Sequence, residues 1–210
     1  LYDVTASGQG GHGTTPHNTK DPLLAACQMV TLLEQIPARR VDPLETVIFP
    51  VCSIHGGDAP NVIPNEVKFG GVSRAYVESV RKVVDQQVND IAKGVEALSG
   101  CQVLIHHYEG YPAVYNDKAL IDLVRTSVRA ELGEDAIVEQ DIPFSFSEDF
   151  SYYTQLGNIP GAYFMVYAGH VGDLSPLHSS TCVMQEEAMP VGMAAMASTA
   201  VAFLNGDFPG

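Results

Sequence analysis

The order of hydrophobic patterns in residues 1–112 constrains the fold of this chain most strongly. Apolar side chains recur every three to four positions over residues 22–36 and 76–98, which is the spacing of amphipathic helices. Alternating, branched or aromatic runs predict four strands, at residues 2–8, 45–54, 67–74 and 101–111. Pro50 cannot donate to a ladder, so we expect its strand at an edge or a bulge. The order strand, helix, strand, strand, helix, strand is that of the split βαβ or ferredoxin-like fold, an antiparallel sheet with its helices on one face.

Residues 113–210 carry a different pattern, with more helix and less strand. Three helical segments are predicted, at about residues 117–132, in a turn from Glu148 and at 187–204. A short strand is predicted at residues 137–139 and a strong one at 162–168. Two strands are too little sheet to cover the apolar faces of these helices. We therefore expect half of a layered α/β domain whose other half lies outside the chain. The first residue, Leu1 rather than Met, also points to a segment of a longer protein.

The composition is that of an ordinary globular protein and excludes several classes of partner. The 210 residues are 46% hydrophobic and 17% charged, and no apolar run approaches the roughly 20 residues of a membrane span. The N-terminal sequence has neither the basic nor the apolar region of a secretory signal. A net charge of −14 does not supply the clustered Lys and Arg that nucleic acid or an anionic membrane requires. We expect a cytoplasmic protein that binds neither.

A glycine-rich stretch, GQGGHGTTPH at residues 8–17, is the first candidate for a functional loop. Such a turn lets the imidazole of His12 approach a ligand closely, although glycines between a strand and a helix can equally form a simple tight turn. Asn61 lies in a second turn-rich segment and Arg74 ends a predicted strand, and we expect both to converge with His12 on one rim. Together these groups can hold a carboxylate or stabilise an oxyanion, whereas each alone is more often an ordinary surface residue.

The second half of the chain offers further candidates. His178 follows a predicted buried strand and a loop, a common place for a site residue, and a neutral imidazole there can bind zinc. Because catalytic zinc needs about three protein ligands, a hydrogen-bonded structural histidine is the alternative. His170, in the same loop, is a weaker candidate for a second ligand. Glu148 and Asp149 either cap the helical turn that follows them or place one carboxylate in a pocket.

Seven segments stand out when they are taken together: GQGGHGTTPHNTKDP, GGDAPNVIP, GGVSR, YNDKAL, SEDFSYY, PGAYF and PLHSS. In this order and spacing they resemble the M20 metallopeptidase family. The resemblance is closest to its amidohydrolase branch, which includes aminoacylases, hippurate hydrolases, indole-acetyl amino acid hydrolases and N-acetyl-diaminopimelate deacetylases. It implies a di-metal catalytic domain interrupted by a smaller lid domain that commonly dimerises. Residues 1–112 would be the lid, and residues 113–210 the returning C-terminal part of the catalytic domain.

The resemblance also assigns roles position by position. His178 matches a metal ligand, and His12 matches the lid histidine that helps to polarise the scissile carbonyl, in many members across a dimer. Asn61 and Arg74 match substrate-binding positions of the lid, and Glu148 matches a position that lines the pocket. The family's CGHDxH-like motif and its Glu-Glu pair, which bring most metal ligands and the catalytic base, are not found in this sequence. The chain should therefore be inactive alone.

The function implied by the resemblance is metal-dependent hydrolysis of the amide bond of N-acyl amino acids or small peptides. The complete enzyme would use two divalent metal ions, zinc or else manganese, cobalt or nickel, with His178 as the one clear ligand in this chain. It would be a homodimer joined through the lid. The alternative is a non-catalytic dimerisation or binding module derived from the same family. Metal-binding motifs upstream of Leu1 would favour the enzyme.

Overall fold

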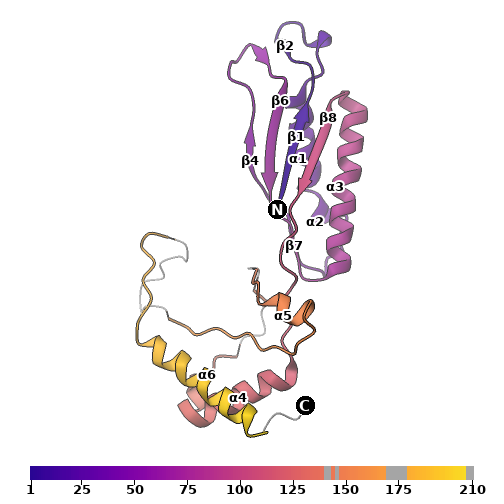
Figure 1. Cartoon of the computed structure of the whole chain (residues 1–210). Helices are drawn as coiled ribbons and strands as arrows, with labels where there is room; N and C mark the ends of the chain where they lie inside the picture. Colours follow the sequence, from indigo (N-terminus) through magenta and orange to yellow (C-terminus); the bar gives the residue numbers. More distant parts are fainter. Residues whose placement is uncertain (140–142, 145–146, 169–178, 207–210) are drawn as a thin grey trace. The chain divides into compact units, whose positions relative to one another are not determined.

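The computed structural model describes residues 1–139, 143–144, 147–168 and 179–206, and the chain divides into two compact units, Leu1–Ala113 and Val114–Gly210 (Figure 1). Each unit has its own cluster of buried apolar side chains. None of the helices in the described ranges is both long and apolar enough to cross a membrane.

The first unit is built on a four-stranded antiparallel sheet. The strand order is β4 (Val51–His55), β6 (Glu66–Gly71), β1 (Tyr2–Ser7) and β8 (Gln102–His107). The central strand β1 pairs along its whole length with both of its neighbours. Along the chain, the long strands and helices of this unit follow one another in the order that the sequence predicts.

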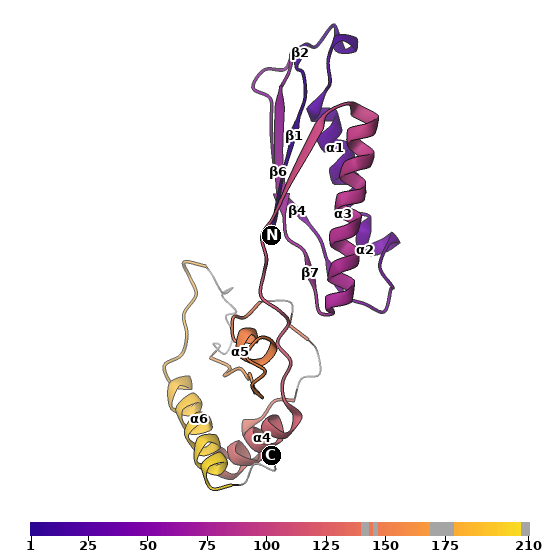
Figure 2. The same cartoon turned by 45° about the vertical axis from the view of Figure 1, so that its right-hand side comes forward.

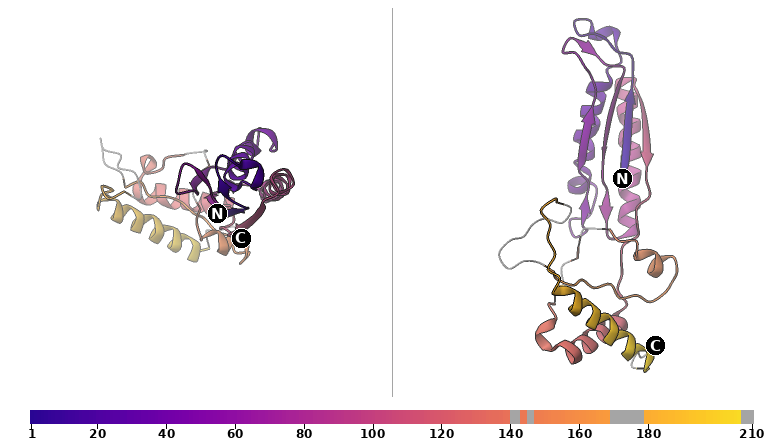
Figure 3. Two further views of the ribbon diagram at one scale, coloured as in Figure 1. Left: turned by 90° about the horizontal axis from the view of Figure 1, so that it is seen from above. Right: turned by 60° about the vertical axis from the view of Figure 1, so that its left-hand side comes forward.

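Two helices, α1 (Pro22–Leu33) and α3 (Glu78–Ser99), lie on the same face of this sheet (Figures 1 and 3). Asp21 caps α1, because its Oδ1 accepts hydrogen bonds from the backbone N–H groups of Leu23, at 2.8 Å, and Leu24, at 3.1 Å. The helix α3 ends at Gly100, whose φ of +71° places it in the left-handed region that glycine adopts freely. A short helix, α2 (Ile36–Arg39), follows α1.

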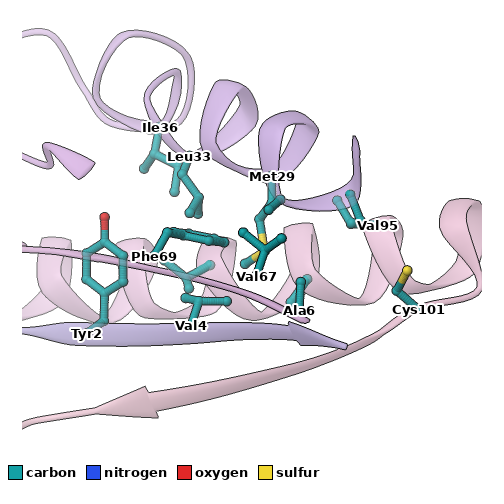
Figure 4. Close-up of a cluster of buried hydrophobic side chains, with 14 of the residues drawn as sticks. Tyr2, Val4, Ala6, Met29, Leu33, Ile36, Val67, Phe69, Val95 and Cys101 are labelled. Atoms are coloured by element: carbon teal, nitrogen blue, oxygen red, sulfur yellow. The ribbon is translucent and has the colours of Figure 1, made fainter. Parts of the chain in front are cut away.

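The core lies between the helices and one face of the sheet (Figure 4). Side chains alternate along β1, so that Tyr2, Val4 and Ala6 are buried while Asp3, between them, is exposed. From α1, Met29 and Leu33 are completely buried against these strands. Burial of side chains this large stabilises the fold by about 1.5–3 kcal/mol each, so this layer holds the unit together.

The strand predicted at residues 45–54 is divided at Pro50. Its first part, β3 (Val47–Ile48), pairs with β7 (Arg74–Ala75) in a separate two-stranded sheet, and its second part is β4. The expected edge position is confirmed, because β4 is an outer strand of the four-stranded sheet and its register shifts between Val51 and Ser53. A single continuous strand was the wrong expectation, since proline has no N–H group to donate to a ladder.

The second unit contains the helices α4 (Lys118–Leu132), α5 (Ser151–Gln155) and α6 (Ala188–Leu204), with a short 3-10 turn, η2 (Glu134–Ala136). The helices α4 and α6 lie side by side (Figure 2). Their buried cluster contains Val124, Val128 and Ala195. The strands predicted at residues 137–139 and 162–168 are not present among the described residues. A strand exists only with a hydrogen-bonded neighbour, and neither segment has a strand beside it there.

Candidate active-site residues

His12 lies in a small two-stranded sheet at one end of the first unit. It belongs to β2 (Gly11–His12), which pairs with β5 (Val62–Ile63) so that His12 lies opposite Val62. One residue further on, the N–H group of Gly13 donates to the carbonyl oxygen of Asn61 at 2.8 Å. Both His12 and Asn61 are exposed. The structure therefore brings together two of the three lid residues that the sequence expected on one rim.

The glycines of this loop allow two backbones to pass at close range. A Cβ at Gly10 would lie 2.3 Å from the carbonyl oxygen of Ile63, which is closer than real Cβ atoms come. The N–H group of Gly10 donates instead to Oδ1 of Asn65 at 2.9 Å. The tight-turn interpretation is therefore confirmed, and a role of the loop in ligand binding stays a prediction.

The imidazole of His12 is contacted by the residue two positions further along the chain. Its Nδ1 lies 3.2 Å from the backbone nitrogen and 2.8 Å from Oγ1 of Thr14. The chain turns here, since the N–H group of Thr15 donates to the carbonyl oxygen of His12 at 2.9 Å and a 3-10 helix, η1 (Pro16–Asn18), follows. Nothing in the sequence pattern singled out Thr14, because a threonine in a turn has no spacing signature of its own.

Arg74 does not join His12 and Asn61, so this part of the prediction is wrong. Ser7 pairs with Glu66 at one end of the β1–β6 ladder, and Tyr2 pairs with Gly71 at the other. These ends are about 17 Å apart at 3.3 Å per residue. The β2–β5 pair lies beyond the first end and β7, with Arg74, beyond the second (Figures 1 and 2). Asn61 precedes β6 and Arg74 follows it, so the two residues lie at opposite ends of the unit.

Glu148 lies in the second unit, half-buried, just before α5. Its carbonyl oxygen accepts hydrogen bonds from the N–H group of Ser151, at 3.3 Å, and from the Ser151 hydroxyl, at 2.8 Å, so the segment does begin a helical turn. Burial, together with a hydrogen bond to the Glu148 carboxylate, raises the pKa of the Tyr163 phenol. The Glu148 side chain thus contacts Tyr163 while its backbone caps the turn.

Asn116 connects a third segment to the same cluster. Its amide donates from Nδ2 to the carbonyl oxygen of Tyr163 at 3.0 Å and accepts at Oδ1 from the Tyr163 N–H group at 2.7 Å. The Asn116 side chain thus takes the place of the backbone groups with which a neighbouring strand would pair. Three of the segments that carried the family resemblance, YNDKAL, SEDFSYY and PGAYF, therefore meet at Tyr163. Asp117, the next residue, caps α4, because its Oδ1 accepts a hydrogen bond from the Leu120 N–H group at 2.9 Å.

His178 and His170, the predicted metal ligands, lie outside the described residues. Within the ranges that the structure covers, no three His, Cys, Asp or Glu side chains gather in a way that could hold a metal ion. The described part of the chain does not by itself form a metal centre.

Comparison with known proteins gives one family for this fold and these segments. The chain superposes on a Bacillus subtilis protein described as a dinuclear metal-binding peptidase from the M20 family, with a TM-score of 0.72 at 22% identity, over 97% of this chain and 49% of that one. The sequence model of peptidase family M20/M25/M40 matches residues 10–202. The chain belongs to this family.

Several relatives within the family are amidohydrolases. The chain is 32% identical to the IAA-amino acid hydrolase ILR1-like 2 of Arabidopsis thaliana over 213 residues, which cover 97% of this chain and 46% of the plant protein. It is 34% identical to the N-acetyl-L-cysteine deacetylase of Bacillus subtilis over 173 residues, which cover 82% and 40% of the two proteins. The chain thus spans about half the length, or less, of the curated relatives it matches.

Proposed function

We propose that this chain provides the lid and the C-terminal part of the catalytic domain of an amidohydrolase that cleaves the amide bond of N-acyl amino acids. The observation that carries the proposal is that His12, which pairs with Val62, and Asn61, which accepts from Gly13, lie on adjacent exposed strand ends in a chain of the M20 family. The first unit, residues 1–113, would be the ferredoxin-like lid. The activity would belong to the complete protein.

The exposed apolar side chains of the second unit support its role as half of a layered domain. On α6, Met189 is 64% exposed, Met193 is 71% exposed and Met196 is 63% exposed. A helix that is apolar on nearly every side is ordinarily buried on more than one of them. In this proposal the missing layer is the sheet of the catalytic domain, supplied by the rest of the protein.

The part that His12 would take in the reaction follows from its chemistry. When water attacks an amide carbonyl, negative charge develops on the carbonyl oxygen, and a fixed N–H donor at that oxygen stabilises the transition state. His12 would be this donor, with Asn61 beside it on the substrate. Arg74 would hold the carboxylate of the amino acid, because a guanidinium binds a carboxylate through two parallel hydrogen bonds. Glu148 would line the pocket.

The cofactors of the complete enzyme would be two divalent metal ions, zinc or else manganese, cobalt or nickel. The family match and the dinuclear Bacillus subtilis protein support this part of the proposal. Since the described residues do not form a metal centre, the ligands would come from the rest of the protein together with His178. The general base would also come from outside this chain.

A homodimer joined through the lid would resolve the separation of His12 and Arg74. The two residues lie beyond opposite ends of one ladder, so a lid that contributes one of them to a site cannot readily contribute the other to the same site. In a two-fold dimer, each site would take Arg74 from one protomer and His12 from its partner.

Mixing two inactive variants tests this arrangement. His12→Ala and Arg74→Ala proteins, refolded together, would form about half heterodimers, in which one of the two sites keeps both residues. About a quarter of the wild-type activity should return. If the mixed sample is no more active than the separate variants, both residues serve the site of their own protomer or neither serves one.

The experiment that tests the function itself uses the full-length protein that carries this chain. The protein, supplied in turn with zinc, manganese, cobalt or nickel, is incubated with a panel of N-acetyl amino acids, indole-acetyl amino acids and dipeptides, and the free amino acid released is measured. Hydrolysis of N-acyl amino acids supports the proposal. Release from none of these substrates, with a folded protein and any of the metals, would favour the non-catalytic dimerisation or binding module instead.

A further inference from the structure

One nitrogen of the His12 ring, Nδ1, accepts a hydrogen bond in this structure. The backbone N–H group of Thr14 donates to Nδ1 of His12 at 3.2 Å, and the Thr14 hydroxyl oxygen lies 2.8 Å from the same nitrogen. A backbone amide can donate but cannot accept, so Nδ1 is the ring nitrogen without a proton. The neutral imidazole therefore carries its proton on Nε2, and Nε2 is the atom that can donate to a ligand.

The backbone around this contact is anchored on both sides. The carbonyl oxygen of His12 accepts from the N–H group of Thr15, at 2.9 Å, and from its hydroxyl, at 3.2 Å. On the other side, the N–H group of Gly13 donates to the carbonyl oxygen of Asn61 at 2.8 Å. The turn that returns Thr14 to the ring is thus fixed by hydrogen bonds that do not involve the imidazole.

We infer that Thr14 is a positioning residue that holds His12 as an Nε2–H donor aimed at the carbonyl oxygen of the substrate. The inference rests on the proposed function, in which His12 stabilises the oxyanion. The other neutral tautomer would present an unprotonated Nε2, which repels an oxyanion instead of stabilising it. With its hydroxyl proton directed at Nδ1, Thr14 adds a second donor beside the amide, so its side chain contributes to both the tautomer and the orientation of the ring.

The tautomer is measured directly by ¹⁵N NMR of the full-length protein labelled at histidine, at about pH 8, where an ordinary imidazole is neutral. The resonances of His12 are assigned by comparison with His12→Ala. Nδ1 should resonate as an unprotonated nitrogen and Nε2 as a protonated one. The reverse pattern, or a fast average of the two tautomers, would overturn the inference.

Three variants separate the hydroxyl of Thr14 from the rest of the turn. Thr14→Val removes the hydroxyl with almost no change of shape and should shift the Nδ1 resonance, whereas Thr14→Ser should restore it. Thr15→Val removes a hydroxyl from the same turn, but one that bonds to the His12 carbonyl oxygen and not to the ring. An Nδ1 resonance that responds equally to Thr14→Val and Thr15→Val would show a general effect on the turn and contradict a specific role of Thr14.

Kinetics give a second and independent readout. Thr14→Val should lower kcat for an N-acyl amino acid about fivefold, the effect of losing one neutral hydrogen bond, and should leave KM unchanged. Thr14→Ser should recover most of the loss. A fall in binding with an unchanged kcat would contradict the inference, because a positioning role for an oxyanion donor acts on the transition state.

The failure of this inference can be told apart from the failure of the proposed function. An active amidohydrolase in which Nδ1 of His12 carries the proton would overturn the inference alone. A protein with the expected tautomer that releases no amino acid from any substrate would overturn the proposed function and leave the assignment of the ring intact.

Discussion

Replacing Gly10 with alanine should separate the two loops that bring His12 and Asn61 together. A Cβ at this position would lie 2.3 Å from the carbonyl oxygen of Ile63 and 2.8 Å from the carbonyl group of Pro64. Both contacts are with backbone, which cannot swing aside as a side chain would. Ordinary van der Waals contact begins near 3.4 Å, whereas the Cβ would lie 2.3 Å from the Ile63 carbonyl oxygen. The two backbones must therefore move apart by about 1 Å.

A displacement of this size breaks the hydrogen bonds between the loops. The bond from Gly13 to Asn61 is 2.8 Å long and that from Gly10 to Asn65 is 2.9 Å long, so a further 1 Å takes both beyond hydrogen-bonding distance. At about 0.5–1.5 kcal/mol each, their loss should destabilise the first unit by about 1–3 kcal/mol. The effect on catalysis should be larger, because a 1 Å misplacement of a catalytic group costs about 100-fold in rate.

The assay compares the free energy of unfolding in urea and kcat for wild type, Gly10→Ala and Gly94→Ala. Gly94 is a matched control, since it lies within α3 and a Cβ there meets no atom within 4 Å. Gly94→Ala should raise stability by up to about 1 kcal/mol, the gain in helix propensity, and leave kcat unchanged. The reasoning would be refuted if Gly10→Ala were as stable and as active as Gly94→Ala.

Three further predictions concern stability. Asp21→Ala removes the cap of α1 and should lower the free energy of unfolding of the first unit by about 1 kcal/mol in urea, whereas Asp21→Asn, which can still cap, should lose much less. Burial raises the pKa of the Tyr2 phenol, so this group stabilises the folded state fully below about pH 10 and loses that contribution as the pH rises further. Above pH 10 the free energy of unfolding should therefore fall faster for wild type than for Tyr2→Phe. Parallel curves of unfolding free energy against pH would contradict this. Asn116→Ala removes both hydrogen bonds to the Tyr163 backbone and should speed hydrogen exchange at the Tyr163 amide; unchanged exchange would show that the pair is not formed in solution.

Much of the first unit could be predicted from its sequence because local patterns determine it. The periodicity of residues 22–36 and 76–98 predicted the helices α1 and α3. Pro50 correctly predicted an edge strand, because the missing N–H group is a local property of the residue. The division of that strand into β3 and β4 depends on which strand each half pairs with. A local sequence pattern does not identify the pairing strand.

The same distinction explains the outcome at the candidate site. The convergence of His12 and Asn61 could be anticipated, because two turn-rich segments flank strands of one small sheet. Arg74 was misplaced because Asn61 precedes β6 and Arg74 follows it, so the length of this strand separates the two residues. In the second unit, residues 162–168 have the composition of a strand, and within the described residues the backbone of Tyr163 pairs with the side chain of Asn116 instead. Composition shows what a segment can form, while its partners decide what it does form.

The most direct test of the central claim is kcat of the full-length protein on an N-acyl amino acid after His12→Ala, with His17→Ala as the matched control. His17 is an exposed histidine of the same loop, in η1. The account predicts a loss of about 100-fold or more in kcat for His12→Ala, the effect of removing one oxyanion donor, and little change for His17→Ala. An unchanged kcat for His12→Ala, or equal losses for the two variants, would contradict the role assigned to His12.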